Sequence, residues 1–195
     1  MHGLINRSIQ LFVTYTYGPD TWGQVTRNAG FEFTEFEGMM RYEDGYTARL
    51  LDAASAVLER SRSEVMEDIG TFIVSNSNFE AVRRLLRFGG IDFVDFLHSL
   101  DDLDERVQLA VAELRLPKIK LRSHTNRHFS LLCDASLPGY GHVMMGVLRA
   151  MADDYGALAL LEHTGQACGQ EVVSIRLVEN DFTEGRDFDL GACAG

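Results

Sequence analysis

The stretch FLHSLDDLDERVQLAVAELRLPKIKLRS, residues 96–123, changes its hydrophobic period part-way along. Up to Leu114 the apolar residues return every three or four positions, which is typical of an amphipathic helix. Pro117 cannot continue that helix, because it lacks a backbone N–H and its ring clashes with the preceding turn. After it, KIKLRS alternates polar and apolar residues, which predicts a strand. The chain therefore passes from helical to sheet structure at this proline.

Upstream of this stretch the sequence indicates mainly helices, and downstream it indicates strands with one helix among them. The predicted helices are 4–15, 20–28, 52–59, 63–69 and 79–88, followed by a long helix at 92–114. Residues 31–46 indicate turns and short extended pieces, and Ser63 with Glu64 indicates the start of one helix. The predicted strands are 118–123, 128–136, 157–164 and 171–180, with a helix at 139–156 between the second and the third.

This order of elements predicts a single domain of the α+β class with two lobes. A helical lobe of about residues 1–65 precedes a lobe of about residues 66–187. The second lobe is expected to hold a four-stranded, mostly antiparallel sheet with one inserted helix. Residues 188–195 are small and polar, and we expect them to form a flexible tail.

The charge balance and the cysteines exclude several classes of protein. Eighteen Lys and Arg against 29 Asp and Glu give a net charge of −11, so the chain lacks the excess of cations that nucleic acids and anionic membranes attract. No apolar run reaches the roughly 18–20 residues of a membrane span, and the first residues lack the pattern of a signal peptide. Three well-separated cysteines without a CxxC pair favour a reducing cytoplasm.

A carboxylate interrupts the apolar side of the helix predicted for residues 92–114. On a helical projection centred on Leu100, the apolar residues lie within about 60°, Asp104 lies at about 40°, and His98 lies almost opposite. We therefore expect Asp104 to face a cavity between the lobes and His98 to face solvent. A buried ionised carboxylate needs a partner, so this position indicates either an acid that extends to the edge of the apolar side or meets a buried arginine, or an opening onto a ligand pocket.

The opening MHGLINRSIQLFVTYTYGPDTW resembles the start of H-NOX domains, the heme nitric oxide/oxygen binding family that includes the sensor domain of soluble guanylate cyclase. The most specific match is Tyr17 to Asp20, followed by Trp22. The similarity continues in chain order through FLHSLDDLDERV to GYGHVMMGVLRAMADDYG. It implies the family's fold, in which heme b lies between a helical lobe and a sheet-containing lobe. It also implies a bacterial sensor of nitric oxide that signals to a separate histidine kinase or cyclic-di-GMP enzyme.

The resemblance assigns the cofactor positions, yet most of them hold residues other than the family's. The family's LxxLH pattern, whose histidine is the proximal iron ligand, falls on Leu100 to Asp104. The tyrosine, serine and arginine of its YxSxR motif, which hold the heme propionates, fall on Cys133, Ala135 and Leu137. Pro117 matches the family proline that presses on the heme, and Val143 stands in place of a distal tyrosine. The implied pocket comprises Ile5, Leu100, Asp104, Pro117, Cys133, Ala135, Leu137, Val143 and Val147.

These replacements weaken the chemistry that the resemblance implies. A carboxylate is a harder and poorer ligand for ferrous iron than a neutral imidazole, and Leu137 cannot form the charged fork that an arginine forms with carboxylates. His142 is the remaining alternative iron ligand, although it projects away from the apolar stripe of its helix. With Val143 on the distal side, a bound heme would suit nitric oxide more than oxygen.

The sequence therefore predicts a sensor or regulatory domain without catalytic activity. Nothing in it resembles a nucleophile–base pair, a phosphate-binding loop or a cluster of residues with metal-ligand spacing. The alternative is a domain of the same fold without heme, which binds another small apolar molecule or a protein.

Overall fold

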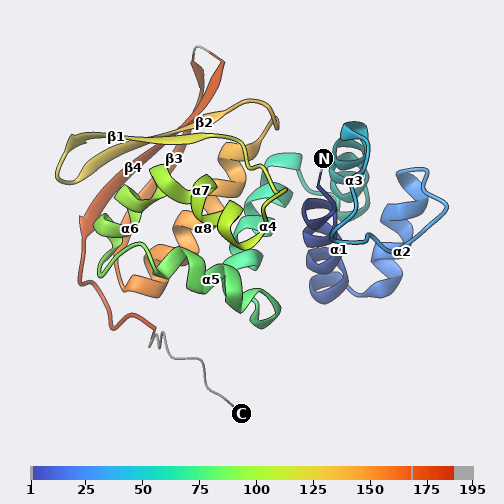
Figure 1. The fold of residues 1–195 in the computed structure, drawn as a ribbon, viewed down its shortest axis with the longest axis horizontal. Coiled ribbons are helices and arrows are strands. Elements are labelled where there is room, and N and C mark those ends of the chain that lie inside the picture. Colours follow the sequence, from blue (N-terminus) through green and yellow to red (C-terminus); the bar gives the residue numbers. More distant parts are fainter. Residues whose placement is uncertain (1, 168, 187–195) are drawn as a thin grey trace.

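A computed structural model describes residues 2–167 and 169–186 (Figure 1). Its helices are α1 (Gly3–Tyr17), α2 (Pro19–Asn28), α3 (Asp44–Leu58), α4 (Arg62–Ser75), α5 (Glu80–Arg87), α6 (Phe93–Ser99), α7 (Leu103–Ala110) and α8 (Tyr140–Tyr155). Two 3-10 turns are η1 (Ser77–Phe79) and η2 (Leu100–Asp102). The strands are β1 (Ile119–Thr125), β2 (His128–Asp134), β3 (Leu158–Ala167) and β4 (Gln170–Glu179).

The four strands form one antiparallel sheet in the order β1-β2-β4-β3. Two hairpins, β1–β2 and β3–β4, are joined through α8, which returns beneath the sheet and contacts β2, β3 and β4 (Figure 1). Cys133 of β2 pairs with Glu171 of β4, which places these two residues side by side near one end of the sheet. The predicted α+β class is confirmed, and so are the four strands and the inserted helix.

Two predicted helices are much longer in the structure. The third helix begins at Asp44 rather than at residue 52, and α4 runs to Ser75 rather than to Ile69. The predicted start of α4 was wrong, because Ser61 caps this helix in place of Ser63. The Ser61 hydroxyl accepts a hydrogen bond from the backbone N–H of Glu64, and the Glu64 carboxylate accepts one from the backbone N–H of Ser61. The tail predicted for 188–195 lies outside the described residues.

The single long helix predicted for residues 92–114 was also wrong, because the segment is divided into α6, η2 and α7. It ends at Ala110, after which Val111 is extended with φ −138° and ψ 91°. Two carboxylates at the division bind the chain as it returns toward the sheet. Asp101 Oδ1 accepts a hydrogen bond from Leu121 N at 2.6 Å, and Asp104 Oδ1 accepts one from Leu116 N at 3.3 Å. These partners are 20 and 12 residues away in sequence, so a helical projection could not reveal them.

Two clusters of buried side chains form the interior, and α4 contributes to both. The first cluster is drawn from residues between Ile9 and Ile69, and the second from residues between Val74 and Leu177. Partly buried Leu137 and Val143 pack against both clusters. The helices α1–α3 therefore form one body and the sheet with α5–α8 forms another, and the two are joined along α4 (Figure 1).

A buried carboxylate holds α5 against α8. Asp154 is 1% exposed, and its Oδ1 accepts hydrogen bonds from Arg83 Nε at 3.1 Å and Nη2 at 2.8 Å. The carbonyl oxygen of Asp154 accepts a third bond from Arg87 Nη1 at 3.2 Å. The Arg87 guanidinium in turn stacks 4.0 Å from the ring centroid of Tyr155. This group fixes the segment that leads from α5 into α6.

The helices α4 and α8 cross with their backbones in contact at two glycines. A Cβ atom on Gly146 would lie 1.9 Å from the carbonyl oxygen of Glu67, and one on Gly70 would lie 2.0 Å from that of Val143. A backbone carbonyl cannot move aside as the end of a flexible side chain can. Both positions therefore exclude every side chain unless the helices separate.

The variant Gly146→Ala is expected to lower the free energy of unfolding by about 3 kcal/mol, because the added methyl group forces α8 away from α4. Urea denaturation measures the change. The matched control is Gly23→Ala in α2, where the nearest atom to the new Cβ is Arg27 Nη1 at 3.5 Å. Alanine should stabilise that helix by about 0.5–1 kcal/mol. Equal stability of Gly146→Ala and the parent would show that the close crossing is not required.

Candidate functional site

Asp104 lies half-buried in the first turn of α7, with both carboxylate oxygens hydrogen-bonded. Its Oδ2 accepts a hydrogen bond from Gln108 Nε2 at 2.7 Å, and its Oδ1 accepts the bond from Leu116 N. The partner that a buried carboxylate needs is thus an amide and a backbone N–H rather than an arginine. His98 is exposed, as predicted.

Five of the nine positions of the implied pocket come together in the structure. Leu100 and Cys133 are 0% exposed and Val147 is 7% exposed, and all three belong to the second cluster. Leu137 and Val143 pack against it. Protein atoms therefore cover Leu100 and Cys133 on all sides. Three further members are half-buried and belong to neither cluster: Ile5, Pro117 and Ala135.

A phenol and a thiol are buried close to Asp104. Burial raises the pKa of the Tyr140 phenol, and the neighbouring Cys133 and Asp104 raise it further. Burial, with a smaller effect of the Glu171 carboxylate, raises the pKa of the Cys133 thiol to about 12. Both groups are therefore neutral at physiological pH. Cys133 does not present the thiolate that metal binding or nucleophilic attack requires.

Glu171 lies at the centre of a polar cluster at the start of α8. Its side chain is buried, and its two oxygens accept hydrogen bonds from Gly139 N at 2.6 Å and Gly141 N at 2.8 Å. A helix leaves such N–H groups unpaired at its start, so this carboxylate caps α8 from a neighbouring strand. His163 Nε2 lies 3.4 Å from Glu171 Oε2.

His142 and His163 stack beside this carboxylate, with ring centroids 4.2 Å apart and planes inclined by 16°. Burial lowers the pKa of His142, and His163 lowers it further, against a smaller opposite effect of Glu171. Sequence reasoning considered His142 only as an iron ligand and missed both His163 and Glu171. The alternation of β4 carried the signal, because Glu171 occupies the inward phase with three apolar residues: Val173, Ile175 and Leu177.

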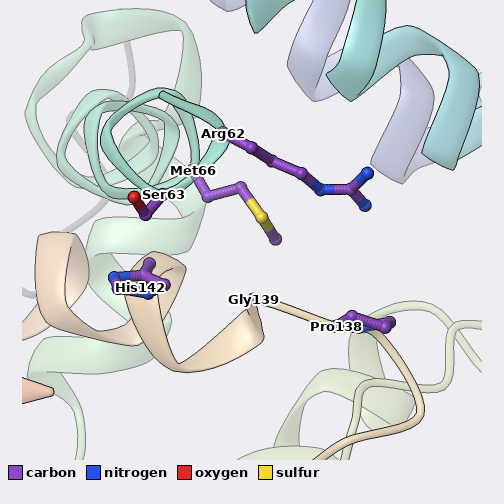
Figure 2. A pocket seen from close by; sticks show the side chains of 6 residues that line it. All are labelled: Arg62, Ser63, Met66, Pro138, Gly139 and His142. Carbon is purple, nitrogen blue, oxygen red and sulfur yellow. The ribbon is translucent and has the colours of Figure 1, made fainter. Parts of the chain in front are cut away.

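A shallow pocket opens beside His142, between the first turns of α4 and α8. Its volume is about 230 Å³, and its lining residues are Arg62, Ser63, Met66, Pro138, Gly139 and His142. Figure 2 shows Ser63 and Met66 on the α4 side and His142 on the α8 side, with the Arg62 side chain directed away. Arg62 Nη1 pairs with Asp52 Oδ1 at 2.5 Å. None of the nine positions implied for heme lines this pocket.

Two absences hold for the part of the chain that the structure describes. No group of three or more His, Cys, Asp and Glu side chains there is placed to hold a metal ion. None of the helices in that part is both long enough and apolar enough to cross a membrane.

Residues 2–163 match the family model described as Haem-NO-binding. The chain belongs to the H-NOX family. Soluble guanylate cyclase gcy-32 of Caenorhabditis elegans is 32% identical over 156 residues, which cover 78% of this chain and 23% of that protein. Soluble guanylate cyclase 89Db of Drosophila melanogaster is 24% identical over 188 residues, which cover 94% of this chain and 28% of that protein. This H-NOX chain therefore spans about a quarter of the length of these curated relatives.

Solved H-NOX structures share the fold at low sequence identity. The Fe(II) unliganded H-NOX protein from K. algicida gives a TM-score of 0.77 at 16% identity, covering 94% of this chain and 100% of that one. A mutant of the S. oneidensis H-NOX protein in the Fe(II) state gives 0.77 at 17% identity, covering 92% and 97%. The predicted H-NOX-like arrangement is confirmed.

H-NOX domains normally hold heme, and the residues present here do not fit a histidine-ligated one. At the ligand position the Asp104 carboxylate is already hydrogen-bonded to Gln108 and Leu116. At the propionate positions, Cys133 is a buried neutral thiol and Leu137 has no donor. Packing around Leu100 and Cys133 would also have to open before a porphyrin could lie against them.

The folding stability of this H-NOX chain is expected to fall as the pH drops below about 6.5, the ordinary pKa of histidine. The pKa of His142 is lowered in the folded state, so the unfolded state takes up a proton first and gains stability relative to the folded state. The loss begins near that pH and grows until the folded pKa is reached. Urea denaturation at pH 7.5 and 5.5 measures it, and His142→Gln should reduce the difference. The exposed His128→Gln is the control, and equal effects of the two substitutions would assign the pH dependence elsewhere.

Proposed function

We propose that this chain is a regulatory domain of H-NOX type that controls a separate output protein, and that a histidine-ligated heme is not its resident cofactor. The observation that carries the proposal is Asp104. A carboxylate stands where the family has its iron ligand, and its oxygens hold Gln108 and the backbone of Leu116. By the family resemblance, the output protein is a bacterial histidine kinase or a cyclic-di-GMP enzyme.

A regulatory role is supported over a catalytic one by the chemistry of the buried polar groups. Tyr140 and Cys133 are held in their neutral forms by burial, and Glu171 is engaged as a helix cap. Tyr140 and Cys133 lie inside the packed core and Glu171 is occupied by two backbone N–H groups, so none of the three offers a substrate an open approach. Catalysis needs a nucleophile or base within reach of a bound substrate, and these side chains do not provide one.

The arrangement of contacts supports a way for a signal to cross the domain. Asp101 and Asp104 hold the returning chain at Leu121 and Leu116. In the same part of the chain, shortly before Leu116, Glu113 Oε2 pairs with Arg41 Nε of the helical lobe at 3.5 Å. A partner that moves either lobe therefore acts on the same segment, residues 111–121, which ends within the edge strand β1.

An absorption spectrum of the purified chain after heme supplementation tests the proposal. We expect no sharp Soret band and no shift on addition of nitric oxide, because neither an imidazole ligand nor a propionate clamp is present. The H-NOX protein from K. algicida, treated identically, is the positive control. A sharp Soret band that shifts with nitric oxide in this chain would overturn the heme-free assignment.

A second function, the binding of a small apolar molecule, is favoured by the pocket between α4 and α8. Its volume of about 230 Å³ suits a molecule of the size of indole. Indole should raise the melting temperature of the parent in a concentration-dependent way and leave that of Ser63→Phe, which fills the pocket, unchanged. Identical changes in the melting temperatures of the two proteins would show that indole does not bind in this pocket.

A further inference from the structure

The connection between α2 and α3, residues 29–43, is a long loop whose backbone is firmly held. Trp22 Nε1 donates a hydrogen bond to Thr34 O at 2.6 Å, and Phe36 N donates one to Gln10 Oε1 at 3.0 Å. Gly3 N donates a bond to Met40 O at 2.8 Å. Long loops without secondary structure are uncommon in compact domains, and they often carry function. We call this segment the Glu–Met loop.

The Glu–Met loop turns apolar side chains and carboxylates outward together. Met39 is 74% exposed, Met40 55% and Phe33 37%. Four glutamates of the same loop are exposed: Glu32, Glu35, Glu37 and Glu43. Across the ranges 2–167 and 169–186, no ion pair joins any of these four carboxylates to a cation. The loop therefore presents free negative charge beside adaptable apolar surface.

Three arginines lie in or against this loop, and among the described residues none of them forms an ion pair with its four glutamates. Arg41 pairs with Glu113 of the sheet-containing lobe, and Arg7 donates to the carbonyl of Phe36 at 3.2 Å. The Arg49 guanidinium lies 4.7 Å from the ring centroid of Phe31 and stacks on Tyr46 as well. The four carboxylates therefore remain available to a cation supplied by another molecule.

We infer that the Glu–Met loop is a docking surface for a cationic amphipathic segment of a partner protein. Methionine side chains adapt to different apolar partners, because they are unbranched and polarizable. The glutamates attract lysine and arginine over several ångströms and set the orientation of the segment. The pinned backbone is already ordered, so binding loses little conformational freedom in the loop.

This surface lies where binding is felt by both lobes. Met40 is bonded to the first residue of α1, and Arg41 reaches Glu113 in the segment that Asp104 holds. The inference rests on the proposed function in one respect only: the Glu–Met loop would be the place where the partner of this regulatory domain attaches. It does not depend on whether heme binds.

Fluorescence anisotropy of the full chain with a labelled synthetic peptide tests the inference. The probe is an amphipathic Lys/Leu helix of about 18 residues, or five turns, and a Glu/Leu peptide of the same pattern serves as the opposite-charge probe. The test protein carries Glu→Gln at 32, 35, 37 and 43. The control carries Glu→Gln at 59, 105, 162 and 179, which are exposed glutamates on other elements, so both proteins gain the same net charge.

The parent should bind the Lys/Leu peptide, and the loop variant should bind it at least about tenfold more weakly, which corresponds to 1.4 kcal/mol. The control should stay within about twofold of the parent. Met39→Ser with Met40→Ser should also weaken binding while leaving its salt dependence unchanged, because those side chains carry no charge. Equal losses in the loop variant and the control, or binding of the Glu/Leu peptide, would overturn the inference. A heme spectrum contrary to the proposed function would leave this result as it stands, so the two failures are distinguishable.

Discussion

The combined variant Asp104→His, Cys133→Tyr, Ala135→Ser and Leu137→Arg is expected to bind heme several powers of ten more tightly than the parent. An imidazole is a better ligand for ferrous iron than a carboxylate. Each charge-assisted hydrogen bond of an arginine fork contributes on the order of 1.5–3 kcal/mol, and 1.4 kcal/mol corresponds to tenfold in affinity. Titration with heme, followed by the Soret band and by the spectral signature of histidine ligation, measures the gain.

The control for this variant moves only the histidine. Asp101→His with the same three other substitutions places the imidazole three residues earlier, on an exposed residue that bonds to Leu121. This control should recover the propionate contacts without the iron–histidine signature. A parent that already binds heme tightly with an imidazole signature would contradict the prediction. His142→Ala would then identify the ligand.

Replacing Asp154 by alanine is expected to lower the free energy of unfolding by about 3–5 kcal/mol, the usual consequence of breaking a buried ion pair from one side. The carboxylate is 1% exposed, and its partners Arg83 and Arg87 have side chains that are 14% exposed. Both arginine side chains are mostly covered by protein, so removal of the carboxylate leaves their charges poorly solvated. Urea denaturation monitored by circular dichroism measures the loss.

The neighbouring residue provides the matched control. Asp153 is exposed on the same helix, so Asp153→Ala should change the unfolding free energy by less than about 0.5 kcal/mol. Asp154→Asn keeps the shape and one acceptor, and its loss should lie between those of the two alanine variants. A loss below about 1 kcal/mol for Asp154→Ala would show that this buried ion pair stabilises the fold no more than an exposed ion pair does.

The parts of the fold that could be predicted from the sequence are those governed by local pattern. Apolar alternation located β1 to β4, and Gly139 and Gly156 bracketed α8 as expected. The parts that could not be predicted depend on distant partners. The helix is divided after Ser99, in the segment where Asp101 and Asp104 accept hydrogen bonds from the backbone of Leu121 and Leu116. No period within residues 92–114 contains that information.

The candidate site likewise has one part that the sequence predicted and another that only the fold reveals. The exposure of His98 follows from helical geometry alone, and it was predicted correctly. The cluster of His142, His163 and Glu171 joins a helix to a hairpin, and only the fold brings its members together. A glutamate in the inward phase of a strand was the available signal, since a carboxylate there must find donors. Whether the nine positions implied by family resemblance hold a cofactor stays a prediction.

The crossing of α4 and α8 at two glycines limits how these helices can move relative to each other. Because the backbones touch at Gly70 and Gly146, the two helices cannot approach further, and the freedom left to them is to pivot or to slide. The Glu–Met loop belongs to the body of α1–α3, and the sheet packs on α8, so the crossing lies between them. A rotation of α8 about this crossing would change the contacts that Leu137 and Val143 make with both clusters. These two side chains are therefore where a displacement of one body would first be felt by the other.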